Sequence, residues 1–191
     1  MKNKKENFVL AIIFILTGIL LRLVPHAPNF SPISAIALFS GAYLSKKWGI
    51  FIAVFAMAVS DFFIGLYDIK IMASVYLSFI ISVLLGSLVK KNRNWKSVAF
   101  VSLASSISFF IITNLAVFVF SPWYEKTING LIYCYFLALP FLKNTVMSDI
   151  FYTFLFFGLY ELSLGAAKKY AAHIYGHGNK KRFCYKWQDN N

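Results

Sequence analysis

The sequence has few charged residues and only two cysteines. Charged residues make up 14% of its 191 positions and hydrophobic residues 59%, whereas a soluble domain typically has about 25% charged residues. This composition excludes an ordinary water-soluble domain. Cys134 and Cys184 lack the paired spacing of a metal site, so we expect no bound metal. The predicted topology places them on opposite sides of the membrane, so we expect no disulfide between them.

Sequence motifs for catalysis are also missing. The chain has no Gly-rich phosphate-binding loop, no helical pair of histidines around a glutamate, and no Gly-x-Ser-x-Gly turn. We therefore expect no enzyme activity, no catalytic residues and no cofactor. Any transport driven by ATP would need ATPases on other polypeptides.

Basic residues outnumber acidic ones by 19 to 7, which gives a net charge of +12. In a soluble protein this excess would suggest a nucleic-acid partner. In a membrane protein it is first compared with topology, because Lys and Arg gather on the cytoplasmic side. We therefore expect membrane lipids, and no nucleic acid, around this chain.

Long apolar runs predict an all-α integral membrane protein with six transmembrane helices. A helix needs about 20 apolar residues to cross a bilayer. The predicted spans are residues 8–24, 31–45, 48–66, 71–89, 97–120 and 144–164.

Two of the apolar runs are too short for a full crossing. Residues 31–45 are still counted as the second span, with Ser31 as the expected N-cap and Pro32 in the first helical position. Residues 129–142, interrupted by Pro140, are expected to form a short external or re-entrant helix before the last span. The membrane domain then covers residues 1–164, and residues 165–191 form a basic cytoplasmic tail against anionic lipid headgroups.

The distribution of basic residues predicts that both termini are cytoplasmic. With six spans, fifteen of the 19 basic residues lie inside. The four outside are Arg22, Lys70, Lys126 and Lys143. This asymmetry follows the positive-inside rule, and it holds only if residues 129–142 do not cross the membrane.

Four polar residues fall within the outer halves of different spans. They are Arg22, Asp61, Asn114 and Asp149. Ionisable residues inside a membrane face protein or a water-filled cavity. Two interpretations are open: Arg22 pairs with Asp61 or Asp149 merely to neutralise buried charge, or the four residues line a pocket that opens outward.

A proline-rich segment, residues 25–32, favours the pocket. Its three prolines forbid a continuous helix, so the next helix is expected to begin inside the membrane and to present its N-terminus to a polar or anionic ligand. Asn29, Ser31 and His26 in this segment are candidate ligand contacts. Alternatively, His26 forms a local hydrogen bond or is a metal ligand.

Small residues recur at four-residue spacing in the fourth span. Ser74, Ser78, Ser82 and Gly86 form a stripe that permits close approach of another helix. The stripe is explained either by packing within the monomer or by docking to a partner membrane protein.

The polar motifs of the chain resemble those of a family of small, poorly characterised bacterial membrane proteins with six helices. The shared motifs are Arg22-x-x-Pro25-His26-x-Pro28-Asn29-Phe30-Ser31-Pro32, Ser60-Asp61, Thr113-Asn114, and Asn144-Thr145 with Asp149. That family in turn resembles the substrate-binding S components of energy-coupling factor (ECF) transporters. The resemblance covers residues 8–164.

The resemblance implies a function in vitamin uptake at the bacterial inner (cytoplasmic) membrane. An S component captures a vitamin-like small molecule from outside and passes it on with a transmembrane coupling subunit and two ATPases. Its pocket is closed by external loops. The implied substrate-binding residues are Arg22, His26, Asn29, Ser31, Asp61, Asn114, Asn144 and Asp149.

The sequence departs from the S components at the docking surface. Many of them carry an Ala-x-x-x-Ala pair on the first span, whereas here Ala11 is followed four positions later by Ile15. A transporter that works alone is therefore an alternative. Two others remain: a non-catalytic assembly protein that uses its small-residue stripes, and an outer-leaflet enzyme that uses Asp61 or Asp149 with His26.

Overall fold

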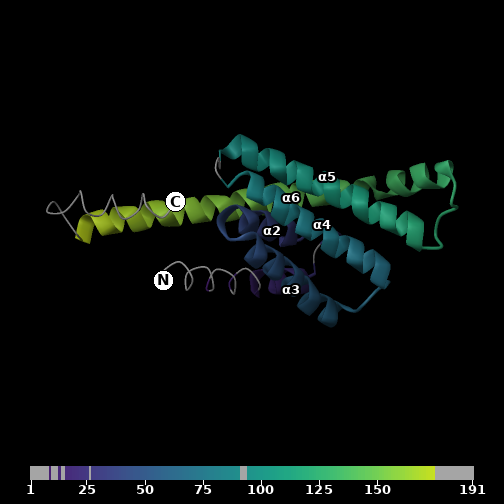
Figure 1. The fold of residues 1–191 in the computed structure, drawn as a ribbon, viewed down its shortest axis with the longest axis horizontal. Helices are drawn as coiled ribbons and strands as arrows, with labels where there is room; N and C mark the ends of the chain where they lie inside the picture. Colours follow the sequence, from purple (N-terminus) through teal and green to yellow (C-terminus); the bar gives the residue numbers. More distant parts are fainter. Residues whose placement is uncertain (1–8, 10–12, 14–15, 26, 91–93, 175–191) are drawn as a thin grey trace. The chain divides into compact units, whose positions relative to one another are not determined.

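The computed structural model describes residues 9, 13, 16–25, 27–90 and 94–174, with side chains as far as Leu162. All regular secondary structure in this part of the chain is helical, which confirms the predicted all-α class (Figure 1). Residues 16–23 are also helical. The other helices are α2 (Ile33–Tyr43), α3 (Lys46–Ile64), α4 (Ile69–Leu88), α5 (Trp95–Phe120) and α6 (Ile128–Ile174).

Four helices are long and apolar enough to cross a membrane. They are α3, α4, α5 and the part of α6 from Ile128 to Leu162. Their outer faces carry large apolar side chains, such as Phe62, Leu88 and Phe100, each more than 70% exposed. Exposure of such apolar surfaces to water is unfavourable, whereas their contact with a lipid bilayer is not. The helices therefore indicate a membrane protein.

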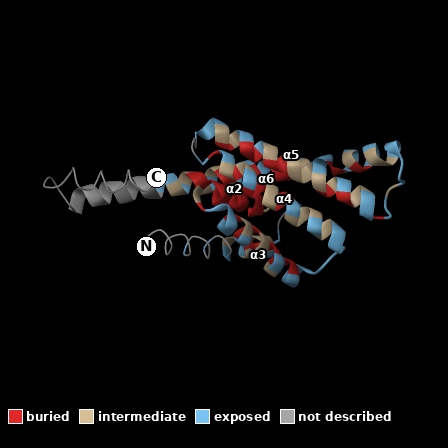
Figure 2. Ribbon diagram, viewed as in Figure 1, coloured by how far each residue is buried: buried red, intermediate tan, exposed pale blue. Residues whose placement is uncertain are grey.

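The chain divides into two units, Met1–Phe156 and Phe157–Asn191. At the centre of the first unit lies α2, and ten of its eleven residues are buried (Figure 2). It packs most extensively against α4 and next against α3. At 11 residues the helix is about 16 Å long, too short to span a bilayer on its own. Neighbouring helices, not lipid, therefore surround the predicted second span.

Close approach of α2 and α4 depends on two glycines. A Cβ atom at Gly86 would overlap the backbone of Leu38, and one at Gly41 would overlap the backbone of Val83. Ser82, one turn before Gly86, is buried and shares a hydrogen bond of 2.7 Å with Ser105 of α5. These members of the small-residue stripe therefore pack inside the fold.

Helices α3, α4 and α5 each begin two residues before the predicted position. Polar caps set these starts: Ser45 accepts a hydrogen bond from the backbone N–H of Trp48, Asp68 from those of Lys70 and Ile71, and Asn94 from that of Ser97. The prediction began each helix near its first apolar residue and so left out the polar first turn. Similarly, α2 begins at Ile33, after Pro32 rather than Ser31 as N-cap.

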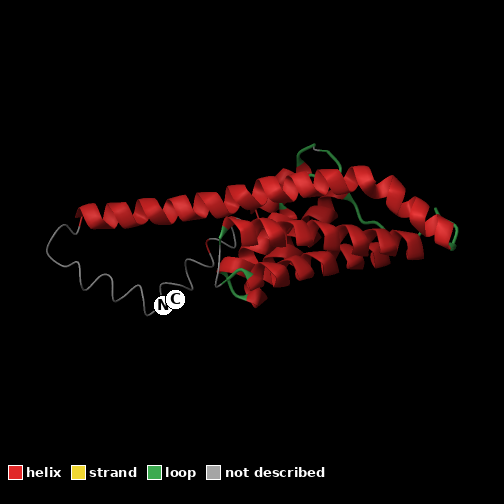
Figure 3. Cartoon of the chain, turned by 90° about the horizontal axis from the view of Figure 1, so that it is seen from above, coloured by secondary structure: helices red, strands yellow, loops and turns green. Residues whose placement is uncertain are grey.

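The predicted break between residues 129–142 and 144–164 is wrong. Both runs belong to the single helix α6, which contains Pro140 in its interior. Figure 3 shows the helix continuing without interruption and bending close to its N-terminal end. A proline removes one N–H and kinks a helix, but in membrane helices the freed carbonyl is commonly satisfied by neighbours. The helix also extends to Ile174, into the predicted tail, whose remainder lies outside the described residues.

Candidate functional site

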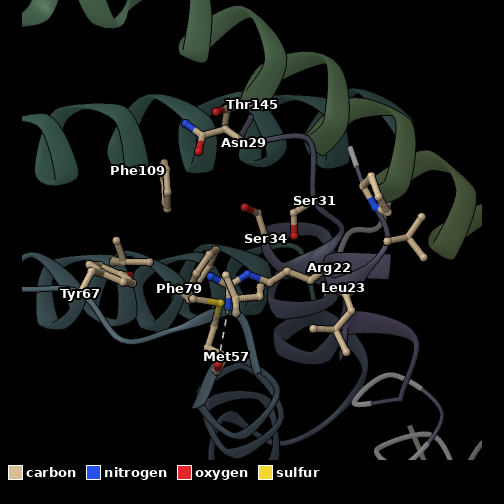
Figure 4. Close-up of a pocket in the computed structure, with 14 residues that line it drawn as sticks. Arg22, Leu23, Asn29, Ser31, Ser34, Met57, Tyr67, Phe79, Phe109 and Thr145 are labelled. Carbon is tan, nitrogen blue, oxygen red and sulfur yellow. Dashed lines mark hydrogen bonds between the residues drawn. The ribbon is translucent and has the colours of Figure 1, made fainter. Parts of the chain in front are cut away.

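A cavity of about 530 Å³ lies within the first unit (Figure 4). This volume is within the range of roughly 300–1,000 Å³ that is typical of small-molecule sites. Exposed residues such as Val24, Pro25 and Asn29 contribute to its lining, so the cavity reaches the protein surface. The lining residues are Arg22, Leu23, Val24, Pro25, Asn29, Ser31, Ser34, Met57, Ile64, Tyr67, Val75, Phe79, Phe109 and Thr145.

An ion pair forms one side of the cavity. Nη2 of Arg22 lies 2.7 Å from Oδ1 of Asp61, in a contact that is an ion pair rather than an aligned hydrogen bond. Nη1 of Arg22 donates to Ser60 Oγ at 2.6 Å, and the hydroxyl of Tyr76 donates to Asp61 Oδ2 at 2.8 Å. Asp61 is 1% exposed, whereas the Arg22 side chain is 17% exposed and lines the cavity. Arg22 therefore lines the cavity while the Asp61 carboxylate compensates the charge of its guanidinium.

Tyr67, in the loop between α3 and α4, adds a polar group next to this pair. Burial raises the pKa of the Tyr67 hydroxyl, and the nearby Asp61 carboxylate raises it further. The phenol is therefore neutral over the physiological pH range and can donate a hydrogen bond into the cavity.

Two aromatic rings form the apolar wall. Phe79 of α4 and Phe109 of α5 lie with their ring centroids 5.5 Å apart and their planes at 37°. Met57 and Val75 extend this wall. Aromatic faces of this kind suit a flat apolar group of a ligand.

The opposite wall is polar. Ser31 and Ser34 lie between Arg22 and the pair of side chains formed by Asn29 and Thr145 (Figure 4). Asn29 has a φ of 61°, a left-handed conformation that asparagine tolerates better than most residues. The cavity thus has hydroxyl and amide groups facing an aromatic wall, with an ion pair at one side.

Helix α6 fastens the proline-rich segment in place. Asn144 donates from Nδ2 to the carbonyl of Pro28 at 3.0 Å, and one turn later Ser148 donates to the carbonyl of Ser31 at 2.9 Å. On the next turn the ring of Tyr152 contacts that of Phe30, with centroids 5.8 Å apart. The two hydrogen bonds satisfy backbone carbonyl groups that have no helical partner in the proline-rich segment.

The structure brings some of the predicted site residues together and separates others. Arg22, Asn29 and Ser31 line the cavity, and Asp61 lies behind Arg22. Asn114 is not among the lining residues: its Nδ2 donates to the carbonyl of Phe110, one turn back in its own helix.

Two further predicted residues, Asn144 and Asp149, contact protein groups around the cavity. Asn144 binds the proline-rich segment, and Oδ2 of Asp149 lies within hydrogen-bond distance, 2.7 Å, of the Ser106 hydroxyl of α5. His26 lies outside the described residues. The predictions that these side chains bind a ligand stay predictions.

Sequence reasoning missed several lining residues. Ser34 could have been found, because it lies in the first turn of the helix that follows the proline-rich segment. No comparable signal marked Phe79 and Phe109 among the 21 phenylalanines of the chain. In the part of the chain that the structure describes, no three His, Cys, Asp or Glu side chains gather to hold a metal.

The structure thus shows an all-helical chain whose long apolar helices indicate a membrane protein, with a cavity inside its first unit. The chain belongs to DUF6580, a family of unknown function, which matches residues 2–173. No curated protein and no solved structure matches the chain.

Proposed function

We propose that the protein binds a vitamin-like small molecule in this cavity, as the substrate-binding subunit of an uptake system of the ECF S-component type. The observation that carries the proposal is the combination of an aromatic wall, a polar wall and a charge-compensated arginine around one cavity of about 530 Å³. Binding sites for small molecules are mostly apolar with a few placed polar groups.

The charges around the cavity favour a ligand without net charge. Among the described lining residues, Arg22 carries the charge, and Asp61 compensates it at 2.7 Å. An anionic ligand would have to compete with this carboxylate for the guanidinium. A neutral molecule with a flat apolar part against Phe79 and Phe109, and with hydrogen-bonding groups toward Ser31 and Ser34, fits the walls better.

The membrane orientation is part of the same proposal. In the first unit, the N-terminal end of α3 lies at the same end as the C-terminal end of α4, and the loop between α3 and α4 lies at the other end (Figure 1). Helix α3 begins with Lys46 and Lys47, and Lys90 follows α4 in the sequence. The positive-inside rule then assigns the first end to the cytoplasm. Tyr67, which lines the cavity, lies in a loop at the opposite end, so the cavity would receive its ligand from outside.

Release into the cytoplasm would require partners. The chain has no sequence motif for ATP hydrolysis, so a transmembrane coupling subunit and ATPases are the proposed source of energy. Because Ile15 replaces the second alanine of the usual docking pair, docking would use another surface, or the protein would work alone.

The test is mass spectrometry of small molecules released from the gently purified protein. Phe109→Ala removes part of the cavity wall, and Phe100→Ala, on the exposed face of the same helix, is the matched control. We expect one compound from the wild type and from Phe100→Ala, and at least a tenfold smaller amount from Phe109→Ala. A wild type without a compound, or equal amounts from all three proteins, would contradict the proposal.

A further inference from the structure

Asp149 is a buried carboxyl group with no counter-charge among the residues that the structure describes. It is 1% exposed and lies on α6, in the apolar part of that helix. Its partners among the described residues are hydroxyl groups, from Ser106 of α5 at 2.7 Å and from Ser34 of α2. Asp61, equally buried, differs because Arg22 and Tyr76 both contact it.

Within the described part of the chain, the groups that contact Asp149 from the neighbouring helices are neutral. Ser34 is the group from α2, and Ser106 is the group from α5. The hydroxyls of Ser102, one turn before Ser106 on α5, and Thr153, one turn after Asp149 on α6, lie 3.4 Å apart, and both residues are fully buried. An ionised carboxylate is strongly disfavoured where neither water nor a cation compensates it.

The hydrogen bonds of Ser106 point to the same protonation state. Its hydroxyl lies 2.7 Å from Asp149 Oδ2 and 3.2 Å from the backbone carbonyl of Ser102. One hydroxyl has a single hydrogen to donate. If Asp149 carries a proton, the carboxyl O–H donates to Ser106 and the Ser106 O–H donates to the carbonyl, so both contacts are hydrogen bonds.

We propose that Asp149 is a proton-binding site, occupied near neutral pH, at the junction of α2, α5 and α6. The bound proton neutralises the carboxyl group and completes the chain of hydrogen bonds from Asp149 through Ser106 to the Ser102 carbonyl. The site adjoins the cavity, because the Ser34 that faces Asp149 also lines the cavity wall. The cavity is thus one side chain away from the proposed proton site. This inference does not depend on the identity of the ligand or on transport.

The test is infrared spectroscopy of the purified full-length protein in phospholipid vesicles near neutral pH. A protonated carboxyl group has its own carbonyl-stretching band, which moves in D₂O. We expect this band in the wild type, its loss in Asp149→Asn, and its retention in Asp68→Asn, where asparagine is an equally good helix cap. Absence of the band from the wild type would overturn the proposal.

Two further measurements keep the result interpretable. Spectra are recorded with and without sodium ions, and a band that disappears when sodium is added would show a sodium site and overturn the proton assignment. If Asp149→Asn does not fold, Ser106→Ala is used instead. Removing the hydroxyl that accepts from the carboxyl should move the band to higher frequency, and an unmoved band would overturn the proposed pairing.

Discussion

Replacing Asp61 with asparagine tests the ion pair at the cavity. The asparagine keeps an oxygen acceptor for Tyr76 but leaves the guanidinium of Arg22 without its carboxylate. Removal of one partner from a buried ion pair destabilises a protein by about 3–5 kcal/mol. Because the Arg22 side chain is 17% exposed, we expect the lower value, about 3 kcal/mol, or a decrease in Tm of roughly 6–12 °C.

The double variant Arg22→Met with Asp61→Asn separates stability from ligand binding. It removes both charges, so the melting temperature in detergent should recover by at least half of the loss. If Arg22 serves only to neutralise Asp61, the double variant keeps the co-purifying compound. If Arg22 contacts the ligand, the compound is lost although stability returns, and this is the result that the proposed function predicts.

A single variant, Asp61→Asn, that melts at the wild-type temperature would refute the reasoning about the buried pair. A double variant less stable than Asp61→Asn would refute it as well, because removing an uncompensated charge should not destabilise the fold further.

Three further predictions follow from individual contacts. Asn144→Ala removes a hydrogen bond to the proline-rich segment, so the bound compound should be released at least several-fold faster. Asn114→Ala should not change the release rate, because the Asn114 amide bonds a carbonyl of its own helix. Release is followed by mass spectrometry during washing. Gly86→Ala should destabilise the fold by about 3 kcal/mol because a methyl group overlaps the α2 backbone, against almost no effect of the exposed-site variant Leu84→Ala in thermal melting. The raised pKa of Tyr67 means that the fold holds this proton more tightly than the unfolded chain, so stability should fall as the pH rises above its ordinary value of 10.0, and melting temperatures of Tyr67→Phe should fall less steeply there.

Hydropathy predicted the helices of this protein better than their ends. Apolar runs located α3, α4 and α5 because lipid-facing and buried residues are both apolar. The runs could not locate polar first turns, which Ser45 and Asp68 cap. Pro140 was also predicted to interrupt a helix, as a proline commonly does in a soluble protein, whereas α6 continues through it.

The charged residues of the candidate site were predictable from the sequence, because burying a charge in a membrane costs free energy. That cost identified Arg22, Asp61 and Asp149 as residues requiring partners. In the structure, Arg22 forms its ion pair with Asp61 and not with Asp149. Which partner is chosen depends on helix rotation, which a single sequence does not encode locally. The same holds for Asn114, whose amide is satisfied within α5.

The burial of α2 changes what selects its amino acids. A helix in contact with lipid needs hydrophobic side chains, whereas a helix enclosed by other helices needs small side chains. Serine at position 40 and glycine at position 41 are therefore acceptable there, although both are poor choices for a helix that faces acyl chains. Among relatives, side-chain volume should vary far less than polarity along these eleven positions.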